Sequence, residues 1–418
     1  MNIWIIDHYS SDPKFGGISR QYDFAKEMSN RNYDVTVISS SFSHFSHSYI
    51  SGEKIHLETI NNRARYIYLH TSKYKKNGGL GRIINAFSFV KSVIFNKKAI
   101  ENMVGKPDVV VGCSVHPFTW IAANNVAKKY KAIFNVEVRD LWPENQIVDE
   151  GMSKYHPMAI ALGILEKWAY KKANYIIYSL SNADEYICDC LGFSREKVTW
   201  IDNPIDAKRF DCNSNRFDEL PPHVSSFMEG HFICAFTGYL KDYEGVQEMI
   251  QAAKIIKDEG LPIRFIFLGS GDQEEYLKSY AKENNLDNVL IGGRISKELI
   301  PTVLTHSDIC MAHLAVKGNK ESYKYGMSKN KVNEYLCSGR YVIFGSYNKK
   351  QVVSYSGGGV TINAFDADAF ADEIKRAYYM CPEERAAVGA KGRKYMLENN
   401  SVEHLIDKYE KTLSRREQ

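Results

Sequence analysis

The chain has 418 residues, more than one ordinary hydrophobic core holds, and this length predicts two domains with additional segments. Its hydrophobic content of 44% and its charged content of 25% are typical of a soluble globular protein. The formal net charge of +4 is too small for a dedicated nucleic-acid binder, so no nucleic-acid partner is expected.

Membrane-spanning and zinc-binding proteins are also disfavoured by the sequence. No apolar stretch approaches the ~20 residues that a bilayer span requires. The eight cysteines include no Cys-x-x-Cys pair, and Cys188-x-Cys190 lacks the second pair or the flanking histidine of a zinc site. We therefore expect reduced thiols in a cytoplasmic protein that is soluble or peripheral on the inner face of the cell membrane.

The first βα unit predicts a nucleotide-binding fold. An apolar strand over residues 3–6 leads into a polar loop that ends at Gly16 and Gly17, and an amphipathic helix follows. A glycine pair also occurs in a plain turn, so this loop alone is weak evidence for a site. Further strands are expected over 34–39, 55–60 and 66–69.

Residues 72–98 combine lysines and an arginine with apolar residues at helical spacing. Two interpretations remain open: a core helix with ordinary solvated lysines, or a basic amphipathic element on an anionic membrane, where each nearby cation contributes about 1 kcal/mol. In the second interpretation Ile83, Phe87 and Ile94 insert, while the lysines that meet the headgroups are Lys75, Lys76 and Lys98.

Polar side chains follow two successive predicted strands. The strand over 108–111 leads to His116, and the strand over 133–138 leads to Arg139 and Asp140. Ligands of open α/β sheets bind at such carboxyl ends. The alternatives are that His116 caps the next helix and that Arg139 and Asp140 form an internal ion pair.

The α/β alternation starts again after a polar segment that contains Pro221 and Pro222. Before it, helices over 158–172 and 181–191 alternate with strands over 175–178 and 198–201. After it, six further strands predict a second doubly wound sheet: 232–236, 263–268, 289–291, 308–311, 341–344 and 360–362. We place the first domain at 1–204, the second at 205–385, and helices that cross back to the first domain at 386–418.

The stretch 323–344 predicts a loop, a short helix and a buried strand. Ser328 or Asn330 can cap the helix, and Gly339 ends it. The positive N-terminal end of such a helix suits a phosphate, and Glu334 suits a vicinal diol. Alternatively, Lys331 and Glu334 form an ordinary solvated pair, because they are three residues apart. The pair Asp366-x-Asp368 is interpreted as a helix cap, so no metal site is assigned.

Two motifs resemble the family-4 glycosyltransferases of bacterial surface polysaccharide synthesis: GMSKNKVNEYLCSGRYVI (326–343) and RDLWPE (139–144). The resemblance implies two Rossmann-like doubly wound domains facing across a cleft (GT-B), and retaining transfer without a metal or cofactor. The implied donor is a nucleotide-diphosphate sugar of the UDP-N-acetylsugar type. The implied acceptor is a polyprenyl-diphosphate-linked or other glycan of O-antigen or capsule.

The resemblance also implies roles for individual residues. The catalytic set is His116, Arg139, Asp140 and Lys331, and the acceptor side has Arg20 and Glu144. An interdomain hinge is expected at Asn203 and Asp206. The donor is expected to contact Gly16, Gly17, Gly238, Gly271, Arg294, Ile295, Ser328, Asn330, Lys331 and Glu334.

The sequence departs from the family pattern in the donor domain. Tyr239 and Glu244 stand where many members carry an arginine and a lysine for the diphosphate, and Gly326 replaces one acidic residue. Lys331 is the natural substitute cation. A sugar-nucleotide 2-epimerase of the same fold and an inactive nucleotide-binding scaffold remain the alternative functions.

Overall fold

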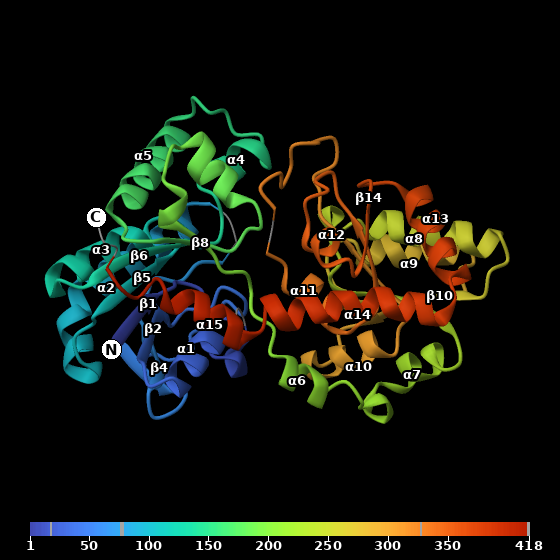
Figure 1. Ribbon diagram of the computed structural model, residues 1–418, viewed down its shortest axis with the longest axis horizontal. Helices are drawn as coiled ribbons and strands as arrows, with labels where there is room; N and C mark the ends of the chain where they lie inside the picture. Colours follow the sequence, from blue (N-terminus) through green and yellow to red (C-terminus); the bar gives the residue numbers. More distant parts are fainter. Residues whose placement is uncertain (17–18, 76–78, 327, 416–418) are drawn as a thin grey trace. The chain divides into compact units, whose positions relative to one another are not determined.

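The computed structural model describes residues 1–16, 19–75, 79–326 and 328–415. The chain forms two compact α/β units, residues 1–204 with 402–418 and residues 205–401 (Figure 1). Each unit has its own mainly parallel sheet between helices, which confirms the expected pair of Rossmann-like domains. The chain returns to the first unit at residue 402, whereas the sequence placed this return at 386, because α14 packs within the second unit.

The first sheet contains all eight strands expected from the sequence. Their order is β3-β4-β2-β1-β5-β6-β7-β8, and the β3–β4 pair is antiparallel while the others are parallel. The strands are β1 (Asn2–Ile6), β2 (Asp34–Ser40), β3 (Ile55–Thr59), β4 (Ala64–Leu69), β5 (Val109–Cys113), β6 (Ile133–Val138), β7 (Ile176–Tyr178) and β8 (Val198–Trp200).

Helices cover both faces of this sheet. Ile3 and Ile5 of β1 pack with Phe24 of α1, and α15 packs against α1 on this side (Figure 1). Helices α2 and α3 pack together, and α3 lies against β5. The helices are α1 (Arg20–Asn30), α2 (Leu80–Val104), α3 (Thr119–Tyr130), α4 (Glu144–Val148), α5 (Pro157–Lys172) and α15 (Val402–Glu410), with short turns η1 (Pro13–Phe15), η2 (Glu185–Cys190) and η3 (Arg195–Lys197). The helix expected over 181–191 is present over 183–190, and its part Glu185–Cys190 (η2) has π-helical geometry.

The second sheet contains the six expected strands, all parallel, in the order β11-β10-β9-β12-β13-β14. This order starts at β9 and proceeds outward in both directions, as in a doubly wound sheet. The strands are β9 (Phe232–Tyr239), β10 (Ile263–Ser270), β11 (Val289–Gly293), β12 (Ile309–His313), β13 (Tyr341–Gly345) and β14 (Gly359–Ile362).

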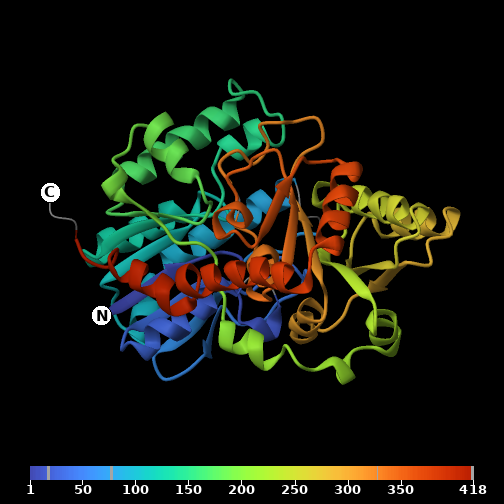
Figure 2. The same ribbon diagram turned by 45° about the vertical axis from the view of Figure 1, so that its right-hand side comes forward.

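Alternating strand residues supply the two cores of the second unit. Phe236 of β9 joins the core under α8, α9 and α13, whereas Ala235 faces the side of α7 and α10 (Figure 1 and Figure 2). The helices are α6 (Ala207–Cys212), α7 (Pro222–Met228), α8 (Val246–Asp258), α9 (Glu274–Glu283), α10 (Ile300–Thr305), α11 (Asn330–Cys337), α12 (Val352–Ser356), α13 (Ala367–Tyr379) and α14 (Pro382–Asn399), with turns η4 (Phe217–Glu219), η5 (Asp242–Glu244) and η6 (Lys297–Leu299).

The sequence predicted that Asp366 caps a helix and that no segment spans a membrane. Asp366 caps α13 by accepting a hydrogen bond from the Ala369 N–H at 2.8 Å, which confirms the cap. Within the part of the chain that the structure describes, no helix has the length and apolar character needed to cross a membrane.

Candidate functional site

The first unit gathers polar residues at the carboxyl ends of β1, β5 and β6, which are neighbours in the sheet. Asp7 and His8 follow β1, His116 follows β5, and Arg139 and Asp140 follow β6. Ser114 joins two of these ends: its hydroxyl oxygen accepts from the Arg139 N–H at 3.0 Å and its hydroxyl donates to the Asp140 carbonyl at 3.3 Å. The parallel strands thus bring together the residues that the sequence placed at their ends.

His116 forms a buried pair with His8. Its Nε2 lies 2.5 Å from Nδ1 of His8, so the two rings share one N–H, and the His8 ring stacks on Phe89 with centroids 4.4 Å apart. Burial lowers the pKa of His116 to about 3 and holds the pKa of His8 well below its ordinary value, so both rings are neutral near pH 7. The ring of His116 is engaged by His8, and α3 has no side-chain cap, so the capping alternative is wrong.

Arg139 pairs with Asp7 and not with Asp140. Its Nη1 lies 3.8 Å from the Asp7 carboxylate, and its side chain is 13% exposed. Burial raises the pKa of Asp7, an effect that Arg139 partly offsets. Burial likewise raises the pKa of Asp140, whose carboxylate forms no hydrogen bond to any residue that the structure describes. The described residues include no ion pair between Arg139 and Asp140, so the alternative of an internal pair is wrong and Asp140 keeps its carboxylate available.

Arg20 is not a contact residue for an acceptor. It is 2% exposed, and its guanidinium donates to Glu137 at 2.8 Å and to the backbone carbonyl of Ile201 at 2.8 Å. It therefore ties α1 to β6 and to the segment after β8, which corrects its assignment to the acceptor side. Glu144 is the half-buried first residue of α4. Gly16 ends η1 with a φ of +77°, and Gly17 lies outside the described residues.

Helix α11 places the main side chains of the second unit. The Tyr335 hydroxyl accepts from the Thr237 N–H at 2.7 Å and donates to the Thr237 carbonyl at 3.0 Å, which fixes α11 against β9. Gly339 follows the helix with a φ of +71°, as expected. The N-cap position is taken by Lys329 without a side-chain hydrogen bond, so the cap expected at Ser328 or Asn330 is wrong.

Two lysines converge on one buried carboxylate beside the end of β9. Nζ of Lys331 lies 2.9 Å from Oε2 of Glu244, and Nζ of Lys329 lies 3.0 Å from the same atom. Lys329 also donates to the His313 carbonyl at 3.0 Å. The alternative of a solvated Lys331–Glu334 pair is wrong, because Lys331 is engaged by Glu244. We call Lys329, Glu244 and Lys331 the lysine cluster.

Burial gives the lysine cluster unusual electrostatics. It lowers the pKa of Lys329 to about 8. The two ammonium groups outweigh burial and lower the pKa of Glu244, so below about pH 8 the cluster carries a net charge of one positive unit. Gly238 adjoins it: a Cβ there would lie 2.6 Å from Nζ of Lys331, and its φ is +134°. Residues with a side chain are strained at this positive φ, so the position favours glycine.

Glu334 lies one turn after Lys331 on α11 and is half-buried. Burial raises its pKa, although Lys297, Arg209 and Lys331 partly oppose that shift. Its carboxylate forms no hydrogen bond or ion pair within the described residues. It can therefore accept two hydroxyl donors from a ligand.

The remaining predicted donor residues lie near the ends of β9, β10 and β11. Gly271 allows close chain packing, because a Cβ there would lie 2.1 Å from the Leu240 carbonyl oxygen. Arg294 is exposed and donates to Ser270 at 2.6 Å, while Ile295 packs on an apolar cluster of the second unit. Ser328 is half-buried and Asn330 is exposed at the start of α11.

The sequence did not single out His8 and Lys329 as site residues. Glu244 was noted only as a residue that stands where many family members carry a cation. The signal for His8 was present, since Asp7 and His8 follow a buried strand directly. The signal for the lysine cluster was weaker. Glu244 and Lys329 are 85 positions apart, and only the β9–β12–β13 order brings their segments together.

Two family models match the two units. Residues 15–209 match the model described as Glycosyltransferase Family 4, and residues 231–379 match the model described as Glycosyl transferases group 1. A segment of 157 residues is 22% identical to 2-deoxystreptamine glucosyltransferase of Streptomyces kanamyceticus. That match spans 37% of this chain and 40% of the relative.

Solved structures share the fold over nearly the whole chain. Sucrose-phosphate synthase of Thermosynechococcus elongatus superimposes with a TM-score of 0.69, 14% identity, and coverage of 98% of this chain and 97% of that one. HepE of Anabaena in complex with UDP and glucose gives 0.66, 14% and 99% of both chains. A trehalose-6-phosphate structure from E. coli bound with UDP-2-fluoro glucose gives 0.72, 10% and 99% of both. Each unit is thus similar to a glycosyltransferase family model, and the chain as a whole has the GT-B fold of these solved structures.

Proposed function

We propose that this glycosyltransferase moves a sugar from a nucleotide-diphosphate sugar to a lipid-linked or other glycan acceptor, with retention of configuration and without a metal ion. The observation that carries the proposal is the lysine cluster beside Gly238, with the carboxylate of Glu334 one turn further along α11. UDP in the similar HepE structure supports a uridine donor, and we propose a UDP-N-acetylsugar.

The second unit is suited to hold the nucleotide part of the donor. The Glu334 carboxylate can accept both ribose hydroxyls, which are charge-assisted hydrogen bonds. The lysine cluster offers one net positive charge to the diphosphate. As the bond to the sugar breaks, negative charge grows on the leaving phosphate, so this interaction strengthens toward the transition state. The cations thereby take the role that a bound metal has in other transferases.

The first unit supplies the groups for the reacting sugar and the acceptor. A positively charged sugar develops in a dissociative reaction, and the carboxylate of Asp140 can stabilise it electrostatically. His116 is neutral near pH 7, so it can hydrogen-bond a sugar hydroxyl but does not serve as a proton donor in the imidazolium form. Burial raises the pKa of Asp7, and the guanidinium of Arg139 partly offsets that shift.

A donor assay separates this function from its alternatives. Incubation with UDP-N-acetylglucosamine and related UDP-sugars, without and with polyprenyl-diphosphate-linked acceptors, should give slow release of UDP alone and fast release with the right acceptor. An isomeric UDP-sugar as the product would show a 2-epimerase. Neither product, together with tight UDP binding, would show an inactive scaffold.

Replacing Glu334 with alanine should weaken UDP binding by about ten- to a hundredfold. The loss of charge-assisted hydrogen bonds to the ribose costs roughly 1.5–3 kcal/mol. Calorimetry with UDP measures the change, and Glu283→Ala, which removes an exposed glutamate at the end of α9, is the matched control. Unchanged affinity in Glu334→Ala would remove the ribose role.

We further propose that α2 brings the first unit to the inner face of the membrane that carries the acceptor. Ile83 and Phe87 are 40% and 50% exposed, and Leu80, Ile84 and Phe95 extend this apolar surface. Ile94 is half-buried, Lys75 is exposed, and Lys98 pairs with Glu101 at 2.9 Å. The expected headgroup contact of Lys76 lies outside the described residues. The exposed apolar side chains with nearby lysines suit an anionic bilayer.

Reversing the charges of Lys75, Lys76 and Lys98 to glutamate should strongly reduce flotation with phosphatidylglycerol vesicles at low salt. Each surface cation contributes about 1 kcal/mol, and added salt should weaken the wild type as well. Lys26→Glu with Lys106→Glu is the control, because both lysines are exposed elsewhere on the same unit. Flotation that is unchanged in the triple variant would contradict membrane docking through this element.

A further inference from the structure

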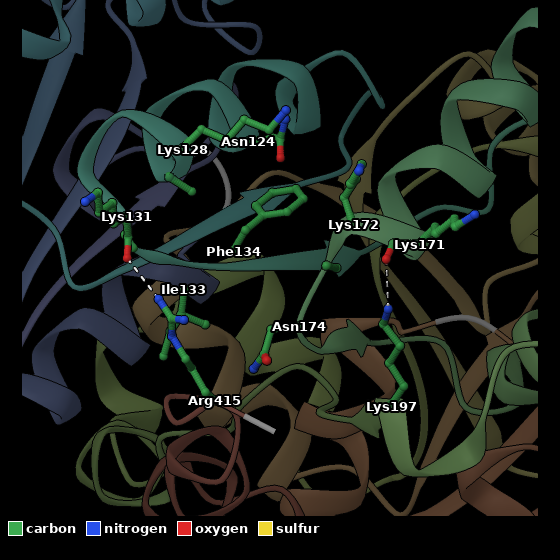
Figure 3. A pocket seen from close by; sticks show the side chains of 13 residues that line it. Asn124, Lys128, Lys131, Ile133, Phe134, Lys171, Lys172, Asn174, Lys197 and Arg415 are labelled. Atoms are coloured by element: carbon green, nitrogen blue, oxygen red, sulfur yellow. Dashed lines mark hydrogen bonds between the residues drawn. The ribbon is translucent and has the colours of Figure 1, made fainter. Parts of the chain in front are cut away.

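A basic hollow of about 620 Å³ lies at the amino end of β6 in the first unit (Figure 3). It is formed between the C-terminal ends of α3 and α5, the start of β6 and the chain after α15. Among the residues that the structure describes, its lining has six cationic side chains and no carboxylate: Lys128, Lys131, Lys171, Lys172, Lys197 and Arg415. His116, Arg139 and Asp140 lie at the carboxyl ends of the strands, which is about 20 Å away along β6.

The charge of this basic hollow exceeds that of the whole chain, which has a net charge of +4. Within the described residues, Lys128, Lys131, Lys171 and Lys172 form no ion pair with a carboxylate. Unpaired like charges around one concave surface raise the local positive potential and favour an anion there. The remainder of the chain is net acidic, so this concentration is not a general property of its surface.

The usual preference for cations near helix C-termini explains only part of the positive charge around the hollow. Lys197 donates to the Lys171 carbonyl at 3.3 Å, and Arg415 donates to the Lys131 carbonyl at 3.2 Å, as cations at helix C-termini often do (Figure 3). The other four lysines are exposed around a buried apolar floor formed by Ala127, Phe134 and Ala173. A charged rim over an apolar floor is the usual composition of a small-ligand site.

We propose that the basic hollow binds a multiply charged phosphate group, carried by a free polyphosphate or by a phosphorylated lipid. Four lysines from the two helix ends line the hollow, and their long, exposed side chains can reach several oxygens of one phosphate group. Its volume suits a small ligand and not a nucleic-acid duplex. This site is separate from the proposed donor site, because its residues all belong to the first unit.

Titration of the full chain with inorganic tripolyphosphate tests the proposal, with saturating UDP present to occupy the donor site. We expect binding that weakens as salt is raised, and a loss of at least about tenfold in Lys128→Ala with Lys171→Ala. Lys26→Ala with Lys106→Ala should bind like the wild type. Lys128→Gln with Lys171→Gln replaces the alanine pair if the latter does not fold.

A second arm uses neutral vesicles doped with phosphatidic acid. Vesicle binding that disappears in the same double variant, with weak binding of free tripolyphosphate, would assign the site to a lipid phosphate and support the proposal. Equal affinity of wild type and double variant for both probes would overturn it, as would the absence of binding to both. Tighter, variant-sensitive binding of a single-stranded RNA would also overturn it.

Discussion

Replacing Lys331 with alanine should lower turnover by on the order of a hundredfold or more, with a smaller loss of UDP affinity. Its ammonium group lies beside Gly238, and in the proposed function it neutralises the additional charge that develops on the diphosphate as the glycosidic bond breaks. Removing one such electrostatic group typically costs two to three decades in turnover. Initial rates at saturating donor, with calorimetry for UDP, separate the two effects.

Glu244→Gln is the matched control for the lysine cluster. It keeps the size of the side chain and removes the negative charge of the cluster, so UDP affinity should rise at a pH low enough to keep both lysines protonated. The unbound protein should lose stability, because two buried ammonium groups then face each other without a carboxylate. Thermal unfolding with and without UDP should show a larger UDP-induced shift than in the wild type. Unchanged UDP affinity in Glu244→Gln, together with the lost stability, would instead show that the ion pairs serve folding alone.

The titration of Lys329 gives a second readout of the same cluster. Burial lowers its pKa to about 8, so it is charged below that pH and loses its proton above it. Turnover that depends on the cluster should therefore fall as the pH rises through about 8. In Lys329→Ala this descending limb should disappear from the pH profile, together with part of the turnover.

The fold could be predicted from the sequence because its strands are continuous apolar runs. The run Tyr341–Phe344 is buried on both faces of the sheet, as parallel strands are, and all fourteen strands could be recognised in this way. The end of the first unit at residue 204 also follows from composition. The return at residue 402 does not, because the pattern of α14 and α15 shows apolar faces without showing which core each one joins.

Residues of the candidate sites could be predicted only where they directly follow a recognisable strand or motif in the sequence. Arg139, Asp140 and His116 follow strands and could be located, but their partners could not. Arg20 illustrates the limit: its position after a glycine loop suggested a ligand contact, whereas tertiary packing directs its guanidinium to Glu137 and to carbonyls about 180 residues away. A side chain with several donors can be satisfied internally, and sequence spacing does not reveal this.

Replacing Asp140 with asparagine should lower turnover by on the order of a hundredfold while the folded state keeps or gains stability. Asp140 is half-buried, its carboxylate has no hydrogen-bond partner among the described residues, and desolvation raises its pKa. A carboxyl group with a raised pKa in the folded state costs stability once the pH exceeds its unfolded value. Asparagine removes that cost at pH 7 but also removes the negative charge that we assign to the developing positive sugar.

Arg139→Gln provides the contrast that separates catalysis from folding at this strand end. It leaves the buried Asp7 without its counter-charge, so both turnover and the free energy of unfolding should fall. Glu150→Gln, which removes an exposed charge near Asp140, should change neither. Urea unfolding and initial rates, measured on all three variants, test the assignment. Full turnover in Asp140→Asn would remove this carboxylate from the site. A loss of stability in Asp140→Asn would show that the charge of Asp140 supports folding and does not serve to stabilise a reacting sugar.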